Sequence, residues 1–529
     1  MAQSSSVYEE GTKPGAVPGD GDGRGGPRPG RGRRVLRWSA TALSLLILAT
    51  AGAGYLYYEH LNGNIDKGRR SSGDSKARKA TPNAAGQTPL NILLVGSDSR
   101  DSDENVKLGG ARKDRGNPPL GDVQMLIHLA ADRKSAAVVS IPRDTRVDIP
   151  ECTDPKTGRT YPPVNTIINA SLARGGAGCT LATWENLTGV YVDHWMTIDF
   201  AGVVKMADAI GGVEVCVRQN VWDRPLPGVS GGSGLKLTAG RKKVQGEQAL
   251  QWLRTRHAWG SDPLRARAQH MYMNSMIRTL KAQNVFTDTG RLTDLAEAAT
   301  RSLHVSEELG TVKKLYDLGM QLKTVPTDRI TMTTLPTAAD PQDRNHLVPA
   351  GTDADRVWAM IRDDVPFDGK GGEPGTKKAE KAEEVSRDPA AADDAIGVLV
   401  QNATRSSTLG PVSGRAGAVA QSLVGKGFTK AAADTSGALS EERTVVRYPS
   451  AELEGDAQRV AKALGVPAGS VKRSTDVFGV TLVVGADWRE GTAYPKQPAP
   501  KAGDLPGDAD ALNGSDAGQC MDVYAPYRW

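Results

Sequence analysis

A long apolar run near the amino terminus sets the first limit on how this chain can fold. Residues 38–58 contain no charged side chain and are long enough to cross a bilayer as a helix. The run ends in Tyr55, Tyr57 and Tyr58 and has no clean Ala-x-Ala cleavage site. We therefore interpret residues 35–58 as an uncleaved transmembrane anchor, with a cleaved signal peptide as the alternative.

Basic residues are distributed unequally on the two sides of this run. Six arginines lie within the fifteen residues before it, whereas one lysine and two arginines lie within the fifteen residues after it. Positive charge stays on the cytoplasmic side of a single-pass protein, so the body of the chain is expected outside the cell membrane. Residues 1–34, which are rich in Gly, Pro and Arg, are expected to form a disordered cytoplasmic tail because they cannot build a core.

Two expected strands carry polar side chains just beyond their ends. Residues 91–96 and 136–141 are apolar runs of strand length, and they are followed by Asp98 and by Arg143. Ligands of α/β sheets bind beyond the carboxyl ends of strands. A carboxylate and a guanidinium are therefore expected at one edge of a sheet, although each alone is more often a turn residue or a local ion pair.

Three arginines lie within twelve residues of one another further along the chain. They are Arg254, Arg256 and Arg265. Asp262 can cap a helix that Pro263 starts, and Gln269 lies one helical turn after Arg265 on the same face. Guanidinium groups this close repel one another unless an anion lies between them, and their planar fork matches phosphate oxygens. The cluster suggests a pyrophosphate or phosphoryl-transfer site; an arginine-rich surface helix is the alternative.

Taken in this order, these segments resemble the LytR-CpsA-Psr family of cell-wall glycopolymer transferases. The resemblance covers residues 89–365. Its further motifs are Glu185 to Gly189, Asp193-His194, Asp199-Phe200, Gly211 to Val215 and Gly246 to Leu250. The resemblance implies an α/β/α catalytic domain with a central mixed sheet. It also implies transfer of a glycopolymer from a polyprenyl-pyrophosphate carrier to peptidoglycan, at the outer face of the membrane.

The same resemblance implies roles for individual residues. The expected substrate-binding residues are Arg100, Arg143, Arg254, Arg256, Arg265 and Gln269. Asp98 and Asp122 are expected to hold Mg²⁺ or Mn²⁺, because Mg²⁺ prefers one or two carboxylates plus substrate oxygens. Either carboxylate could instead, or also, help to deprotonate the attacking sugar hydroxyl. The expected catalytic residues are Asp98, Asp122, Arg143, Arg254, Arg256 and Arg265.

The chain departs from the family pattern at two positions. Where the family has Arg-Ser-Asp-Thr, Leu120 stands in place of the arginine, and Arg112 or Arg115 could supply the missing charge. A second arginine, normally next to the glutamine, is replaced by Ala268, with Arg267 one residue earlier. Because of these departures, one alternative is that the chain is a non-catalytic, membrane-anchored cell-wall binding or scaffold protein. A hydrolase of polyprenyl pyrophosphates is the second alternative.

Composition excludes other classes of function. The chain has 66 basic and 61 acidic residues, a net charge of +5, which is too close to neutral to indicate nucleic-acid binding. Residues 228–232 match a nucleophile elbow only in their letters, since no strand precedes them and no helix follows.

Four cysteines fit an exported protein. Of the three possible connectivities we favour one with a Cys152–Cys179 disulfide, which would close a loop rich in Pro, Gly and Asn. Cys216 lies in an expected buried strand and is interpreted as a small core residue, and Cys520 lies in the tail.

The remaining segments divide the chain further. Residues 59–88 are expected to be a flexible linker, and residues 366–393 a charged linker. Residues 394–490 are expected to form a small α/β domain that is similar to the LytR C-terminal domain. Residues 491–529, rich in Pro, Gly and Asp, are expected to be a disordered tail.

The unequal charge around the anchor predicts the topology. Protease added to intact protoplasts should digest the whole chain after residue 58, because the positive-inside rule places the body outside. Immunoblotting against each end of the chain would measure this. Protection of the C-terminal domain would contradict the predicted orientation.

Overall fold

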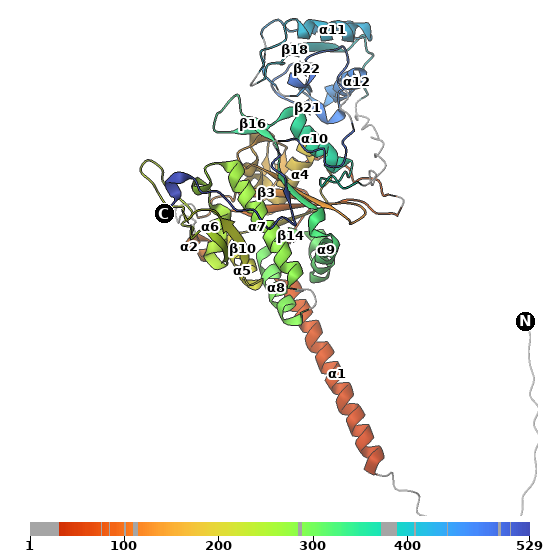
Figure 1. Ribbon diagram of the computed structural model, residues 1–529. Coiled ribbons are helices and arrows are strands. Elements are labelled where there is room, and N and C mark those ends of the chain that lie inside the picture. Colours follow the sequence, from red (N-terminus) through yellow and green to blue (C-terminus); the bar gives the residue numbers. More distant parts are fainter. Residues whose placement is uncertain are drawn as a thin grey trace, which may run out of the picture. The chain divides into compact units, whose positions relative to one another are not determined.

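The computed structural model describes residues 31–529 except 76, 84, 100–101, 109–114, 284–287, 372–388, 407–408, 438, 442, 496–498 and 508 (Figure 1). The chain divides into two compact units, residues 1–60 and 61–529.

The first unit contains most of helix α1 (Arg31–Asn64). Residues Val35–Asn64 form the one helix of the described chain that is long and apolar enough to cross a membrane. Thirty residues span about 45 Å at about 1.5 Å per residue, more than the hydrocarbon thickness of about 30 Å. The aliphatic side chains at its centre, including Leu45 and Leu46, are exposed.

The second unit contains a mixed eight-stranded sheet with the order β1-β14-β9-β2-β3-β4-β15-β23. Its strands are β1 (Asp66–Gly68), β14 (Leu303–Ser306), β9 (His194–Ile198), β2 (Leu90–Ser97), β3 (Gly121–Leu129), β4 (Ala136–Ile141), β15 (Ile330–Thr334) and β23 (Leu512–Asn513). Strands β9, β2, β4 and β15 run in one direction and the other four run in the opposite direction. The ends of β2 and β4 and the start of β3 therefore meet at one edge of the sheet.

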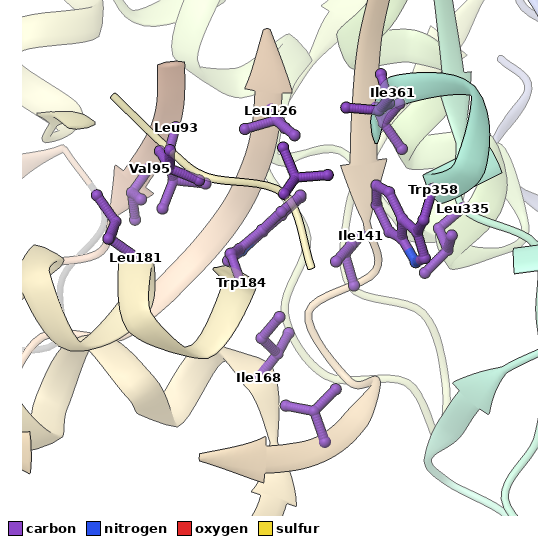
Figure 2. Close-up of a cluster of buried hydrophobic side chains, with 14 of the residues drawn as sticks. Leu93, Val95, Leu126, Ile141, Ile168, Leu181, Trp184, Leu335, Trp358 and Ile361 are labelled. Atoms are coloured by element: carbon purple, nitrogen blue, oxygen red, sulfur yellow. The ribbon is translucent and has the colours of Figure 1, made fainter. Parts of the chain in front are cut away.

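Alternating side chains of β2 and β3 build two cores, one on each face of the sheet. Leu93 and Leu126 pack with Trp184 and Trp358 from helices α4 (Ala177–Thr188) and α10 (Gly351–Arg362) (Figure 2). The opposite face packs against α7 (Asp262–Ala282) and α9 (Val312–Thr324). The expected α/β/α domain with a mixed central sheet is confirmed.

Shorter elements complete the domain around this framework. They are α2 (Asp103–Lys107), α3 (Ser171–Gly175), α5 (Phe200–Ala209), α6 (Gly246–Arg254), α8 (Thr289–Ser302), β5 (Arg146–Ile149), β6 (Cys152–Thr153), β7 (Thr160–Tyr161), β8 (Val164–Ile167), β10 (Val213–Val217), β11 (Val221–Trp222), β12 (Lys236–Leu237), β13 (Gly240–Val244), β16 (Thr337–Ala339) and β17 (Leu347–Pro349).

The segment after the anchor belongs to the domain, so the prediction of a flexible linker over 59–88 is wrong. Strand β1 pairs in parallel with β14. Arg70 Nη1 lies 2.8 Å from the buried carboxylate of Glu185, and the indole of Trp195 donates hydrogen bonds to the carbonyls of Arg69 and Arg70. Backbone and charged groups make these contacts, so the sequence of the segment shows no apolar pattern from which they could be predicted.

A second, smaller sheet forms the C-terminal domain, as expected. Its order is β19-β18-β22-β20-β21. Its elements are β18 (Gly397–Asn402), α11 (Arg415–Gly425), β19 (Lys430–Ala433), β20 (Val445–Tyr448), α12 (Glu454–Leu464), β21 (Val471–Arg473) and β22 (Thr481–Val484). Leu423, Val460 and Trp488 lie in its core.

Two further expectations about connecting segments need correction. Of the expected charged linker, residues 372–388 lie outside the described residues, and Phe367 is buried in the core of the first domain. Residues 509–529 of the expected disordered tail are ordered: β23 pairs with β15, and Met521, Val523 and Tyr527 are buried. Backbone pairing and scattered apolar residues hold the tail, and neither gives a periodic signal in the sequence.

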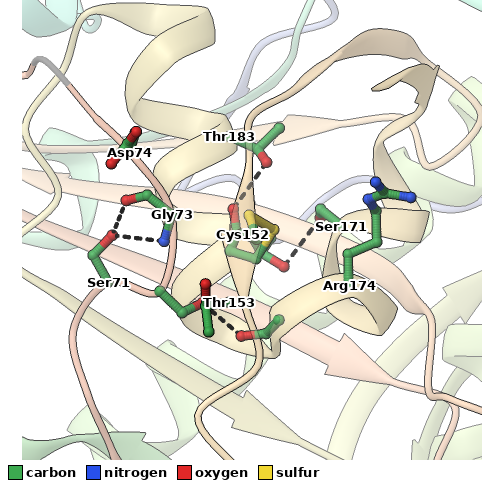
Figure 3. The surroundings of a disulfide bond; sticks show 12 residues. Ser71, Gly73, Asp74, Cys152, Thr153, Ser171, Arg174 and Thr183 are labelled. Atoms are coloured by element: carbon green, nitrogen blue, oxygen red, sulfur yellow. Dashed lines mark hydrogen bonds between the residues drawn. A yellow bond between two sulfur atoms is a disulfide. The ribbon is translucent and has the colours of Figure 1, made fainter. Parts of the chain in front are cut away.

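The structure contains the expected Cys152–Cys179 disulfide, with an S–S distance of 2.05 Å (Figure 3). Gly73 forms a β-bridge with Cys152 beside it, so the disulfide also lies against the segment after the anchor. Cys216 forms a second disulfide, with Cys520. The interpretation of Cys216 as an unpaired core residue is therefore wrong, because a disulfide between residues 304 positions apart leaves no local pattern.

The disulfide of Cys152 and Cys179 should contribute measurably to stability. Replacing both cysteines by serine should lower the free energy of unfolding by roughly 3 to 4 kcal/mol, the chain entropy of a loop of this size. Denaturant unfolding of the full chain measures the effect, and peptide mapping without reduction checks both pairings. Free thiols at Cys152 and Cys179 in the unaltered chain would contradict the assignment.

Candidate active site

The edge of the sheet where β2 and β4 end brings three predicted site residues into one region. Asp98 follows β2, Asp122 lies in β3, and Arg143 follows β4. The register between β2 and β3 shifts by one residue, because Gly96 pairs with Val123 whereas Ser97 pairs with Gly121. Asp122 is the extra residue of this bulge, a device that often redirects a side chain next to an active site.

Arg143 is mostly buried and is held by two carboxylates. Its Nη1 lies 3.0 Å from Asp122 Oδ1, and its Nε lies 3.5 Å from Asp144 Oδ1. Burial alone would lower the pKa of Arg143, but Asp122 and Asp144 outweigh it and raise the pKa above its ordinary value. The guanidinium is therefore a fixed positive charge at the end of β4.

Two of the three arginines of the predicted cluster share one carboxylate. Asp262 Oδ1 lies 2.9 Å from Arg256 Nε, and Asp262 Oδ2 lies 3.1 Å from Arg265 Nη2. The prediction that Asp262 caps the helix is wrong: the side chain of Ser261 caps α7 by accepting a hydrogen bond from the Leu264 N–H. Sequence reasoning missed the counter-ion role of Asp262, although its place between Arg256 and Arg265 is a signal for it.

Arg265 is more deeply buried than Arg143. Its side chain is only 11% exposed. Burial lowers the pKa of Arg265; Asp262 opposes this, whereas Arg143 and Arg256 lower the pKa further. An anion bound beside Arg265 would offset the desolvation cost of its guanidinium and its repulsion from Arg143 and Arg256.

The two regions share one small pocket. Its polar lining consists of Asp122, Gln124, Ser140, Arg143, Asp262, Arg265 and Gln269. Each guanidinium is held by a carboxylate of the chain, so an anionic ligand would compete with Asp122 and Asp262 for the arginines. The structure therefore joins four predicted residues in one pocket, namely Asp122, Arg143, Arg265 and Gln269.

Arg254 and Gln269 make further contacts with the chain, and one predicted residue lies outside the described residues. Arg254 donates to the Leu108 carbonyl over 2.8 Å, and its guanidinium lies 4.7 Å from the centre of the Phe200 ring. Gln269 Nε2 donates to the Leu253 carbonyl over 3.0 Å, which links α7 to the end of α6. Arg100 lies outside the described residues.

Leu120, which stands where the family has an arginine, forms two backbone hydrogen bonds with Asp98. The Leu120 N–H donates to Asp98 Oδ1 over 2.7 Å, and the Asp98 N–H donates to the Leu120 carbonyl over 3.2 Å. Arg115 pairs with Asp103 at 2.7 Å, with both side chains largely exposed, and Arg112 lies outside the described residues.

The donor set fits a Mg²⁺ ion that shares its ligands with a substrate. Asp98 and Asp122 are carried by neighbouring strands that are joined through Leu120. Among the described residues no group of three or more His, Cys, Asp or Glu side chains could form a metal site of its own. Two carboxylates suit Mg²⁺ only where phosphate oxygens and water complete its coordination.

Comparison with known proteins decides the family. A sequence model of the LytR_cpsA_psr family matches residues 55–362, more than half of the chain. The chain belongs to this family. A second model, described as LytR cell envelope-related transcriptional attenuator, matches residues 395–488.

Two curated relatives and one solved structure are similar to parts of the chain. The cell wall biosynthesis protein LcpA of Corynebacterium glutamicum is 30% identical over 58% of this chain and 60% of its own length. The polyisoprenyl-teichoic acid–peptidoglycan teichoic acid transferase TagU of Enterococcus faecalis is 27% identical over 43% of this chain and 64% of its own length. The solved LytR-Csp2A-Psr enzyme from Actinomyces oris is 16% identical, with a TM-score of 0.41, over 59% of this chain and 97% of that chain.

Arg265 should matter more for anion binding than for folding. Arg265→Ala should weaken the binding of inorganic pyrophosphate by about 2 kcal/mol, the size of a charge-assisted hydrogen bond. It should lower the free energy of unfolding by no more than about 2 kcal/mol, because Asp262 keeps Arg256 as a partner and the repulsion from Arg143 is relieved.

Titration calorimetry and denaturant unfolding measure these two effects. Arg291→Ala is the matched control, because it removes the same charge from the exposed surface of α8. A large loss of stability for Arg265→Ala with unaltered pyrophosphate binding would show that Arg265 is only a structural ion-pair partner.

Proposed function

We propose that this protein transfers a glycopolymer from a polyprenyl-pyrophosphate carrier to peptidoglycan, outside the cell membrane. The observation that carries the proposal is one pocket lined by two largely buried arginines, Arg143 and Arg265, at the edge of the sheet. The names of LcpA and TagU, a cell wall biosynthesis protein and a teichoic acid transferase, support cell-wall assembly as the process. The chain spans about 60% of the length of each of these relatives, so their substrates are extended to it only as part of this proposal.

The proposed reaction breaks one bond and forms another at a single phosphorus atom. A hydroxyl of the acceptor glycan attacks the phosphorus that carries the glycopolymer. The bond from this phosphorus to the bridging oxygen breaks, and polyprenyl monophosphate leaves. Negative charge builds on the phosphate oxygens, and fixed guanidinium groups stabilise it without having to reorganise.

The residues of the pocket divide these tasks. Arg143 and Arg265, which both line the pocket, bind the phosphates, while Arg254 and Arg256 add positive charge from the segment before α7. Gln269 links this segment to α7 through its hydrogen bond to the Leu253 carbonyl. Asp98 or Asp122 accepts the proton of the attacking hydroxyl.

Asp98 and Asp122 are also the residues that would hold Mg²⁺ or Mn²⁺. A bound divalent cation would neutralise charge on the pyrophosphate. Asp122 already accepts a hydrogen bond from Arg143, so the same carboxylate orients one phosphate-binding arginine.

We also propose that α1 anchors the protein and that the catalytic and C-terminal domains lie outside the cell membrane. The support is the apolar length of Val35–Asn64 together with the excess of arginine before it. A polyprenyl carrier is itself a membrane lipid, so an anchored enzyme meets its donor without diffusing through water.

A transfer assay tests the proposal against its alternatives. The full chain in detergent is given a short sugar on a polyprenyl pyrophosphate, with and without a peptidoglycan fragment as acceptor, and polyprenyl monophosphate is measured. We expect release that depends on the acceptor, and a loss of at least about a hundredfold for Arg143→Ala, because removing one charge-stabilising donor costs roughly that much.

The other outcomes favour other functions. Release without an acceptor would favour the hydrolase, and no release would favour the non-catalytic scaffold that Leu120 and Ala268 keep open. The Arg291→Ala variant should retain the activity of the unaltered chain.

A further inference from the structure

We propose that the last segment of the chain positions the phosphate-binding arginines, with the backbone N–H of Tyr524 as the positioning contact. We call residues 509–529 the C-terminal segment and residues 254–265 the arginine loop. This inference rests on the proposed function, because it concerns the same pocket. It adds a requirement for residues that lie outside the part of the chain that the family model matches.

The C-terminal segment is attached to the catalytic domain along most of its length. It begins with β23, which pairs with β15 at the edge of the central sheet. The Cys216–Cys520 disulfide follows, and the backbone of Met521 exchanges hydrogen bonds with the Cys216 carbonyl and the Arg218 N–H over 2.9 Å each. Met521 and Val523 are then buried in the core that contains Trp252 and Trp259.

The segment meets the arginine loop at Ala258, two residues after Arg256 and seven before Arg265. The Ala258 carbonyl accepts a hydrogen bond from the Tyr524 N–H over 2.8 Å. The Ala258 N–H donates to Asp223 Oδ1 over 3.2 Å. Ala258 is fully buried, so each of these groups would lose its partner without replacement by bulk water if its contact opened.

Aromatic contacts strengthen the same junction. Gly260 has a φ of +87°, and a Cβ built there would lie 3.6 Å from Tyr524 Cγ, so the tyrosine ring lies directly on the turn of the loop. The Tyr527 ring is stacked on His257 with their centroids 6.1 Å apart. These contacts hold the peptide groups between Arg256 and Arg265 in one conformation.

The segment makes a second contact on the other side of Arg265. Arg267 pairs with Asp510 and also donates to the side chain of Gln519. Arg265 therefore lies between two attachment points of the C-terminal segment, at Ala258 and at Arg267. Asp510 also compensates the charge of Arg267.

A positioning role follows from the precision that phosphate binding requires. A binding group must be held within about 0.5 Å of its productive place, and loops that carry positive-φ glycines do not hold themselves so closely. Asp223 contacts the loop from within the catalytic domain, whereas Tyr524 contacts it from the end of the chain. Loss of the Tyr524 contact should leave the fold intact and the arginines misplaced.

A pair of substitutions at Tyr524 isolates the hydrogen bond. Tyr524 has a φ of −59°, which proline can adopt, so Tyr524→Pro removes the N–H without forcing the backbone from this angle. Tyr524→Ala removes the same ring and keeps the N–H. We expect Tyr524→Pro to bind inorganic pyrophosphate roughly tenfold more weakly than Tyr524→Ala, by titration calorimetry on the full chain in detergent.

A stability control separates positioning from general destabilisation. Leu318→Ala opens the core under α9, which contains neither the arginine loop nor the C-terminal segment, and should lower the melting temperature without changing pyrophosphate affinity. If Tyr524→Pro does not fold, a chain ending at Gly518 with Cys216→Ser replaces it, and the same loss of affinity is expected.

Each other outcome overturns a different statement. Equal pyrophosphate affinity of the proline and alanine variants, or an equal loss in Leu318→Ala, would overturn the positioning role and leave the proposed function standing. Absence of pyrophosphate binding by the unaltered chain would overturn both.

Discussion

The compensation of buried guanidinium groups is the constraint on which the site depends. An unpaired buried charge costs several kcal/mol, so arginines can line a pocket in the empty protein only if carboxylates accompany them. Asp122 provides this for Arg143, and Asp262 provides it for Arg265 while also pairing with the half-exposed Arg256. The two carboxylates come from a bulge in β3 and from the first turn of α7, so the sheet and the helix must both form before the site exists.

The two outermost strands of the central sheet come from opposite ends of the second unit's sequence. Strand β1 follows the anchor, and β23 lies near the end of the chain. Unpaired edge strands invite aggregation, and here short strands from both ends cover the edges. The C-terminal α/β domain is therefore an insertion between two parts of the larger domain, because the chain returns to the eight-stranded sheet after it.

The local sequence pattern predicts the central strands of the sheet. It does not predict the strands and disulfide that join residues far apart in the sequence. Strands β2 and β4 are apolar runs with a polar residue beyond each, so their ends and the positions of Asp98 and Arg143 could be predicted. Strands β1 and β23 are two or three residues long and pair through their backbones, which leaves no periodicity to detect. Asp262 was assigned to capping because a carboxylate at a helix start suits both roles, and only the three-dimensional distances to Arg256 and Arg265 decide between them.

The two departures from the family pattern change charge without removing the frame of the site. Leu120 holds Asp98 through its backbone N–H and carbonyl, which any residue except proline can provide, so the loss of an arginine side chain there does not release this carboxylate. Ala268 is fully buried, and its carbonyl accepts the indole N–H of Trp252 over 3.0 Å. An arginine at 268 would have to place its guanidinium in the core of Trp252 and Trp259, at a large desolvation cost. The proposed site therefore offers fewer positive charges to phosphate than the family pattern provides, so under the proposed function the placement of the remaining arginines matters correspondingly more.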